Sequence, residues 1–199
     1  MRRLILAACF AALPTAALGG AQKYEDLTAS VRAGLHKAVS DQAVPFLAFD
    51  TVEEARAWLD PMSKKLARRM PERHAREEFL VTVHYEAKRA GLDPQLVLGL
   101  IQVESNFRKF AVSGAGARGY MQVMPFWVRL AGNPGDNLFN LRTNLRYGCW
   151  VLRHYLDLEH GDYFRALGRY NGSVGQADYP NLVVRAWINN WKYPARAAG

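Results

Sequence analysis

The sequence contains little cysteine: Cys9 and Cys149 are the only two in 199 residues. A small secreted fold held together by several disulfide bonds is therefore excluded. Long low-complexity tracts are absent, and the sixteen glycines and nine prolines follow no collagen-like period. Half of the residues are hydrophobic and 22% are charged, so the chain can bury a sizeable core and is not disordered as a whole.

Patterns typical of β-strands are also missing, whereas signals for the start and end of helices are frequent. We therefore predict an all-α fold. The expected helices run from a capping box at Thr51 to Pro61, and over residues 71–90, 94–106, a short stretch after Pro125, 141–160, 162–170 and 181–191. Loops are expected over residues 113–119 and at Asp178-Tyr179-Pro180.

Acidic residues are fewer than basic ones, which gives a formal net charge of +8 and a pI of about 9.7. Residues 91–199 hold twelve Lys/Arg and seven Asp/Glu, a net charge of +5, whereas residues 22–90 hold twelve and eleven, a net charge of +1. This balance favours an anionic partner and indicates that its binding surface lies in the C-terminal part.

The chain begins with a short basic segment, Met1-Arg2-Arg3, followed by the almost wholly apolar stretch Leu4–Leu18 and by small residues. These three parts predict a signal peptide over residues 1–21, cleaved after Gly19 or Ala21, and export to the periplasm. An N-terminal membrane anchor would need a longer apolar run. The alternative is a lipoprotein signal at Cys9, although its apolar segment is short.

The segment Gly114–Gly119 spells G-x-G-x-x-G, the pattern of a dinucleotide-binding loop. The preceding segment is an expected helix and no β-α-β unit surrounds it, so we reject this interpretation. The glycines are better explained by tight turns and by a close approach of the backbone to a ligand.

Glu104 lies near the end of an expected helix, 94–106, that is apolar nearly all round. A carboxyl that loses solvent there has a raised pKa and retains its proton, as a general acid at neutral pH must. The alternative is an exposed glutamate at the helix end that pairs with Arg108 or Lys109.

Four short motifs extend this pattern along the second half of the chain. They are Glu104-Ser105, then Gly116-Ala117-x-Gly119-Tyr120-Met121-Gln122-x-Met124-Pro125, then Asn144-Leu145-x-x-Gly148, and last Arg169-Tyr170-Asn171. In this order the series resembles the catalytic domain of soluble lytic transglycosylases, goose-type-lysozyme-like enzymes that cleave peptidoglycan. Tyr120, Arg169 and Phe126-Trp127 depart from the usual residues of the family.

The resemblance implies a lysozyme-like catalytic domain over residues 91–192, with an N-terminal helical extension over 22–90 and a tail over 193–199. It also implies that Glu104 is the one catalytic acid and base, with Ser113 and Tyr170 placed near it. The implied substrate-binding residues are Ser105, Tyr120, Met121, Gln122 and Asn171. We further expect Tyr120 and Phe107 to stack on the glycan, because they flank the motif residues.

The resemblance implies that the chain cleaves the MurNAc-GlcNAc β-1,4 bond without water and leaves 1,6-anhydroMurNAc ends. A hydrolytic muramidase with the same groove and a non-catalytic protein of cell-wall binding or envelope assembly are the alternatives. The expected partner is the peptidoglycan glycan strand, with no nucleic acid, no cofactor and no metal, since the five histidines show no ligand spacing. An envelope or secretion-machine partner, the oligomeric state and endo or exo cleavage are left open.

Overall fold

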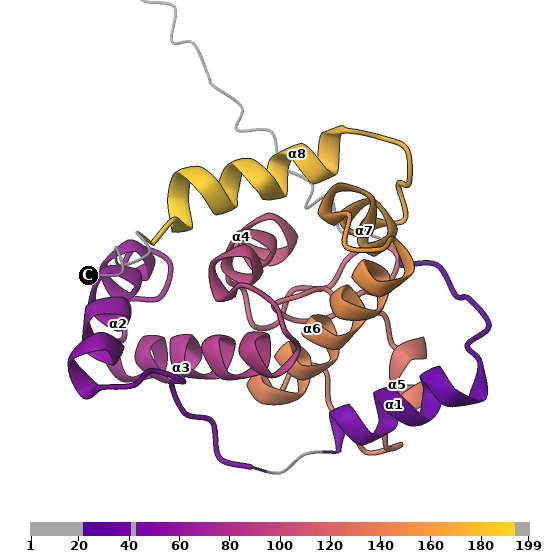
Figure 1. Ribbon diagram of the computed structural model, residues 1–199, viewed down its shortest axis with the longest axis horizontal. Helices are drawn as coiled ribbons and strands as arrows, with labels where there is room; N and C mark the ends of the chain where they lie inside the picture. The colour runs from indigo at the N-terminus through magenta and orange to yellow at the C-terminus, as the bar shows by residue number, and fades with distance from the viewer. Residues whose placement is uncertain (1–21, 41–42, 194–199) are drawn as a thin grey trace, which may run out of the picture.

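The computed structural model describes residues 22–40 and 43–193 (Figure 1). Its helices are α1 (Ala29–Val39), α2 (Val52–Leu66), α3 (Arg73–Arg89), α4 (Pro94–Ser105), α5 (Phe126–Ala131), α6 (Leu141–Leu158), α7 (Tyr163–Asn171), α8 (Asp178–Arg185) and the π-helix η1 (Ala186–Trp191). The only β-type pairing among these residues is a pair of isolated bridges, Val112 with Arg118 and Arg118 with Val123. The predicted all-α class is confirmed. The expected signal peptide, Cys9 and most of the tail lie outside the described residues.

Helix α4 lies in the middle of the molecule, with α3, α8 and η1 packed around it (Figure 1). Five of its apolar side chains have no exposed surface: Leu96, Val97, Leu98, Leu100 and Ile101. At Gly99 a Cβ atom would lie 2.8 Å from the backbone nitrogen of Trp187, so the missing side chain lets η1 approach closely. The apolar sequence of α4 therefore places its C-terminal end, and Glu104, inside the protein.

The predicted helix starts are confirmed where a side chain caps the backbone. Thr51 accepts a hydrogen bond from the backbone of Glu54 at 3.1 Å, and Asp93 accepts one from Gln95 at 2.7 Å. Such caps satisfy N–H groups that a helix leaves unpaired at its start. They depend only on neighbouring residues, which is why the sequence predicts them.

Two predictions about prolines were wrong. Pro61 does not end a helix, because α2 continues to Leu66. Burial of Met62 and Leu66 contributes about 1.5–3 kcal/mol each, which offsets the roughly 3 kcal/mol cost of a proline inside a helix. The second proline, Pro180, lies in the first turn of α8 and not in a loop. A proline is tolerated there because N–H groups in the first turn have no partner within the helix, so a residue without an N–H group breaks no helical hydrogen bond.

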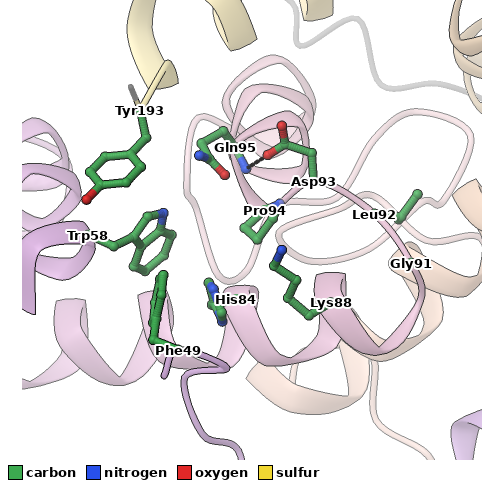
Figure 2. Close-up of a pocket in the computed structure, with 10 residues that line it drawn as sticks. All are labelled: Phe49, Trp58, His84, Lys88, Gly91, Leu92, Asp93, Pro94, Gln95 and Tyr193. Atoms are coloured by element: carbon green, nitrogen blue, oxygen red, sulfur yellow. Dashed lines mark hydrogen bonds between the residues drawn. The ribbon is translucent and has the colours of Figure 1, made fainter. Parts of the chain in front are cut away.

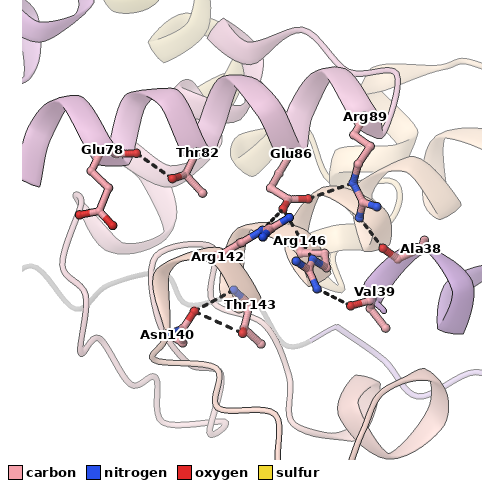
Figure 3. Close-up of polar contacts among 10 residues, drawn as sticks. All are labelled: Ala38, Val39, Glu78, Thr82, Glu86, Arg89, Asn140, Arg142, Thr143 and Arg146. Atoms are coloured by element: carbon pink, nitrogen blue, oxygen red, sulfur yellow. Dashed lines mark hydrogen bonds and ion pairs between the residues drawn. The ribbon is translucent and has the colours of Figure 1, made fainter. Parts of the chain in front are cut away.

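Residues 22–90 and the remainder of the described chain share one hydrophobic core, which extends from Leu35 in α1 to Trp191 in η1. A buried carboxylate also joins them (Figure 3). Glu86 has no exposed surface and lies 3.3, 3.2 and 3.6 Å from side-chain nitrogens of Arg89, Arg142 and Arg146. Arg146 and Arg89 also donate to backbone carbonyls at the C-terminal end of α1, so the same arginines hold this helix and neutralise the buried charge.

A pocket of about 540 Å³ lies on one side of this core, between α2, α3 and the start of α4 (Figure 2). His84 lines it and is 1% exposed, with its ring stacked on Phe49 at 4.7 Å and against the edge of Trp58 at 4.9 Å. Burial, helped by the charge of Lys88, lowers the pKa of His84 to about 4.

No described helix is both long and apolar enough to cross a membrane.

His84 should make the fold sensitive to acid. Its folded pKa of about 4 is below the ordinary 6.5, so its contribution to stability is complete above pH 6.5 and is lost as the pH falls towards 4. We expect wild-type protein to lose up to about 3 kcal/mol more unfolding free energy across this window than His84→Phe. Denaturant titrations at several pH values measure the difference, with the exposed His36→Phe as control. Parallel pH profiles for wild type and His84→Phe would contradict the assignment.

Candidate active site

Glu104 lies in the last turn of α4 and is 1% exposed. Its Oε1 atom accepts a hydrogen bond from the hydroxyl of Tyr179 in α8. The helix ends directly afterwards, because Asn106 and Phe107 both adopt left-handed backbone conformations, with φ of 48° and 65°. Asparagine tolerates this conformation, whereas it is costly for a bulky residue such as Phe107, which needs support from its surroundings. Here the support is the packing of the Phe107 ring, which is buried and 5.3 Å from the ring of Trp191.

Tyr179 is the functional candidate that sequence reasoning missed. It is 4% exposed, and burial together with the carboxyl of Glu104 raises its pKa well above the ordinary value. Tyr179 therefore stays neutral, and its hydroxyl group is a hydrogen-bond donor to Glu104. A helix start at Asp178-Tyr179-Pro180 is readable from the sequence, since proline suits a first turn, but no local pattern indicates that the tyrosine faces Glu104.

The chain segment 119–124, here called the catalytic loop, is fixed beside Glu104 by side chains from three helices. Ser105 in α4 donates to the carbonyl of Tyr120 at 2.7 Å. The backbone N–H of Met121 donates to Asn144 in α6 at 2.8 Å, and the carbonyl of Met121 accepts from the Tyr170 hydroxyl in α7 at 2.8 Å. Burial, together with the nearby Glu104 carboxyl, raises the pKa of Tyr170 well above its ordinary value. Tyr170 thus holds the loop close to Glu104, and Tyr179 donates a hydrogen bond to the carboxyl.

Within the catalytic loop, Met121 and Gln122 are both buried. Gln122 has a left-handed φ of 49°, and its side-chain amide donates to the carbonyls of Ala111 at 3.1 Å and Gly119 at 2.9 Å. Met121 packs so closely on α6 that a Cβ atom at Gly148 would lie 2.4 Å from its sulfur. The side chains of Met121 and Gln122 therefore stabilise the conformation of the loop.

The other predicted site residues lie in different surroundings. Ser113 is partly exposed, and its hydroxyl accepts from the backbone of Ala117 at 3.1 Å. Tyr120 is 7% exposed and its ring lies 4.9 Å from that of Phe79. Asn171 donates to the hydroxyl of Ser173 at 2.9 Å. Hydrogen bonds thus join Ser105, Gln122 and Tyr170 to the backbone of the loop. The hydrogen bonds of Ser113 and Asn171 are to their own segments.

Among the described residues, two carboxylates besides Glu104 are buried, and each has arginine partners. Glu86 binds three arginines, as described above, and Glu159 binds Arg165 and Arg169. Asp136 is partly buried and accepts from the hydroxyl of Tyr147 at 2.5 Å. No group of three or more potential metal ligands occurs in the described part of the chain.

Comparison with known families matches residues 82–181, about half of the chain, to the Transglycosylase SLT domain. The chain therefore belongs to the SLT transglycosylase family, and the prediction made from its four motifs is confirmed. The matched segment begins within α3 and includes Glu104, the catalytic loop and Tyr179.

Two relatives illustrate the match. The chain is 36% identical over 111 residues to a protein named transglycosylase from Enterobacteria phage PRD1, covering 52% of this chain and 41% of the phage protein. It is 44% identical over 129 residues to a membrane-bound lytic murein transglycosylase C of Haemophilus influenzae, covering 57% of this chain and 34% of that protein. The chain thus spans less than half of the length of these curated relatives.

Among solved structures, the chain is similar to an inactive mutant of the lytic transglycosylase Slt from Pseudomonas aeruginosa. The TM-score is 0.45 and the sequence identity 20%, over 68% of this chain and 25% of the other. Family membership rests on the match of residues 82–181 to the domain.

Asn144 should be among the most costly polar residues to remove. It has no exposed surface and, besides binding Met121, its amide donates to the carbonyls of Arg118 and Leu138, each at 2.8 Å. We expect Asn144→Ala to lower the unfolding free energy by about 3 kcal/mol or more, because buried backbone groups lose their partners. Asn140→Ala, which removes the exposed cap of α6, should cost about 1 kcal/mol. Denaturant unfolding compares the two, and equal losses would contradict the role of Asn144.

Proposed function

We propose that this chain is a lytic transglycosylase of peptidoglycan, which cleaves the MurNAc-GlcNAc β-1,4 bond and leaves 1,6-anhydroMurNAc ends. The observation that carries the proposal is the buried carboxyl of Glu104, at the end of an apolar helix and hydrogen-bonded by Tyr179. Membership of the SLT family and the names of the relatives support the same activity.

In the proposed mechanism Glu104 acts twice. Its protonated carboxyl first gives a proton to the glycosidic oxygen, and burial favours this neutral form. The carboxylate that results then takes the proton of the C6 hydroxyl, which attacks C1 of the same MurNAc and closes the anhydro ring. Tyr179 donates a hydrogen bond to Glu104, so it stabilises the carboxylate between the two steps.

The substrate supplies the remaining help at C1. An inverting glycosidase uses a second carboxylate to activate water, and a retaining one uses it as nucleophile. Glu86 and Glu159 are engaged by arginines, and Asp136 by Tyr147. We therefore assign the stabilisation of the developing positive charge to the acetamido oxygen of MurNAc, which the C6 hydroxyl then displaces.

The other predicted residues take two roles in this proposal. Ser105, Met121, Gln122 and Tyr170 act through the backbone of the catalytic loop, as their hydrogen bonds and burial suggest. Ser113, Tyr120 and Asn171 are proposed to contact the glycan. The excess of basic residues after residue 90 suits a polymer that carries peptide carboxylates.

We also propose that the protein works in the cell envelope, in the periplasm, after removal of a signal peptide over residues 1–21. The basic start, apolar stretch and small residues support export. The relatives named membrane-bound lytic murein transglycosylase C act, by that name, on murein at a membrane, which agrees with an envelope location.

Glu104→Gln should fold normally and lose its lytic activity. The substitution keeps the size of the side chain but provides neither the proton nor the base, and general acid–base catalysis is worth roughly 10²–10⁴-fold per group. Release of soluble fragments from purified peptidoglycan measures the loss, and thermal unfolding checks the fold. Activity within a few-fold of wild type would show that Glu104 is not the acid.

Tyr179→Phe should cause a partial loss of activity in the same assay. It keeps the ring and removes the hydroxyl that contacts Glu104, so we expect activity about 10-fold below wild type and well above Glu104→Gln. Tyr147→Phe removes a buried hydroxyl bound to Asp136 and serves as the matched control, with activity close to wild type.

A further inference from the structure

The chain segment 22–25, here called the N-terminal strap, lies against the catalytic loop, about 100 residues away in sequence. Gln22 is 3% exposed. Its side-chain amide donates to the carbonyl of Gln122 at 3.1 Å and accepts from the backbone N–H of Met124 at 3.0 Å. Both halves of the Gln22 amide are therefore bound to the same short stretch of backbone.

These two bonds complete a pattern of pairing along the loop. Val123 exchanges two backbone hydrogen bonds with Arg118, both at 3.0 Å, on one side of the chain. The backbone groups of Gln122 and Met124 that bind Gln22 come from the residues on either side of Val123. Along an extended chain, these groups point to the side opposite the two backbone groups of Val123. The amide of Gln22 therefore binds this second side as a neighbouring strand would. Without it, two buried or half-buried polar groups of the loop would lose their partners.

Two further contacts fasten the strap to helices beside the loop. The ring of Tyr24 lies 5.7 Å from that of Phe126 in α5, edge to face. The carboxylate of Glu25 lies 3.2 Å from the guanidinium of Arg169 in α7, next to Tyr170. The strap is thus tied to the two segments that follow and support the loop, which gives Gln22 a fixed position.

We propose that Gln22 is a positioning residue for catalysis, which holds residues 122–124 so that Met121 and the Tyr170 hydroxyl keep their places beside Glu104. The inference rests on the proposed function. Ser105, Asn144 and Tyr170 support the first half of the loop from within the family domain at 82–181, whereas Gln22 supports the second half from outside it. The N-terminal segment of this chain is accordingly part of its active site.

The test compares Gln22→Ala and Gln22→Glu with wild type, in protein that begins at Gly20 so that Gln22 cannot cyclise onto its own amino group. Gln22→Glu keeps the acceptor for Met124 but sets an oxygen against the carbonyl of Gln122. With soluble glycan strands we expect kcat to fall about 10-fold in both variants and KM to stay within about twofold, because the geometry of the reacting groups changes and the binding surface does not. Gln176→Ala, at an exposed loop position, is the control and should keep the wild-type kcat.

Hydrogen exchange gives a second measurement that needs no activity. The amide of Met124 should exchange faster in Gln22→Ala than in wild type, and should keep most of its protection in Gln22→Glu, where an acceptor remains. The unfolding midpoints of the Gln22 variants should fall by several degrees, because buried groups lose their partners, and should remain well above the assay temperature. A wild-type kcat in Gln22→Ala would overturn the positioning role. So would a loss of kcat that is fully explained by the fraction of the protein that is unfolded at the assay temperature. If wild-type protein cleaves no glycan, the proposed function fails. Unchanged protection of the Met124 amide in Gln22→Ala would separately show that Gln22 does not hold the loop.

Discussion

The candidate active site is organised around the hydrogen bond from the hydroxyl of Tyr179 to the carboxyl of Glu104, two side chains that are almost wholly shielded from solvent. A carboxyl is costly to bury without a partner. Tyr179 is a neutral donor, whereas Glu86 and Glu159 are bound by arginines. An arginine would hold the carboxylate ionised, whereas a tyrosine hydroxyl can serve a group that gains and loses a proton. The hydrogen bond from a tyrosine hydroxyl thus distinguishes Glu104 from the two buried carboxylates that arginines bind.

The catalytic loop shows how an irregular segment is held rigid inside an all-α fold. Its backbone groups cannot pair within a helix, so side chains from α4, α6, α7 and the N-terminal strap bind them instead. Each such bond contributes only about 1 kcal/mol net, but an unsatisfied buried group costs about 1–3 kcal/mol. Loss of any one support therefore weakens the loop, which ties the position of the site to the packing of the surrounding helices.

Local signals in the sequence predicted much of this structure. The caps at Thr51 and Asp93 define helix starts because they involve residues two or three apart, and the apolar face of α4 indicated that Glu104 is buried. The partners of Glu104 could not be predicted in this way. Tyr179 and Gln22 reach the site through tertiary packing, 75 and 100 residues from the groups that they bind. The prediction for Pro61 failed for the same reason, since packing of Met62 and Leu66 against the rest of the core outweighed a local helix-breaking signal.

The central claim is that one buried carboxyl, without a second carboxylate to activate water, carries the reaction. Digestion of purified peptidoglycan in ¹⁸O-labelled water tests this claim most directly, because hydrolysis places an oxygen from water on C1 and ring closure does not. The account predicts 1,6-anhydro-muropeptides that carry no ¹⁸O at C1. Reducing-end MurNAc labelled with ¹⁸O would contradict it and would make the protein a hydrolytic muramidase.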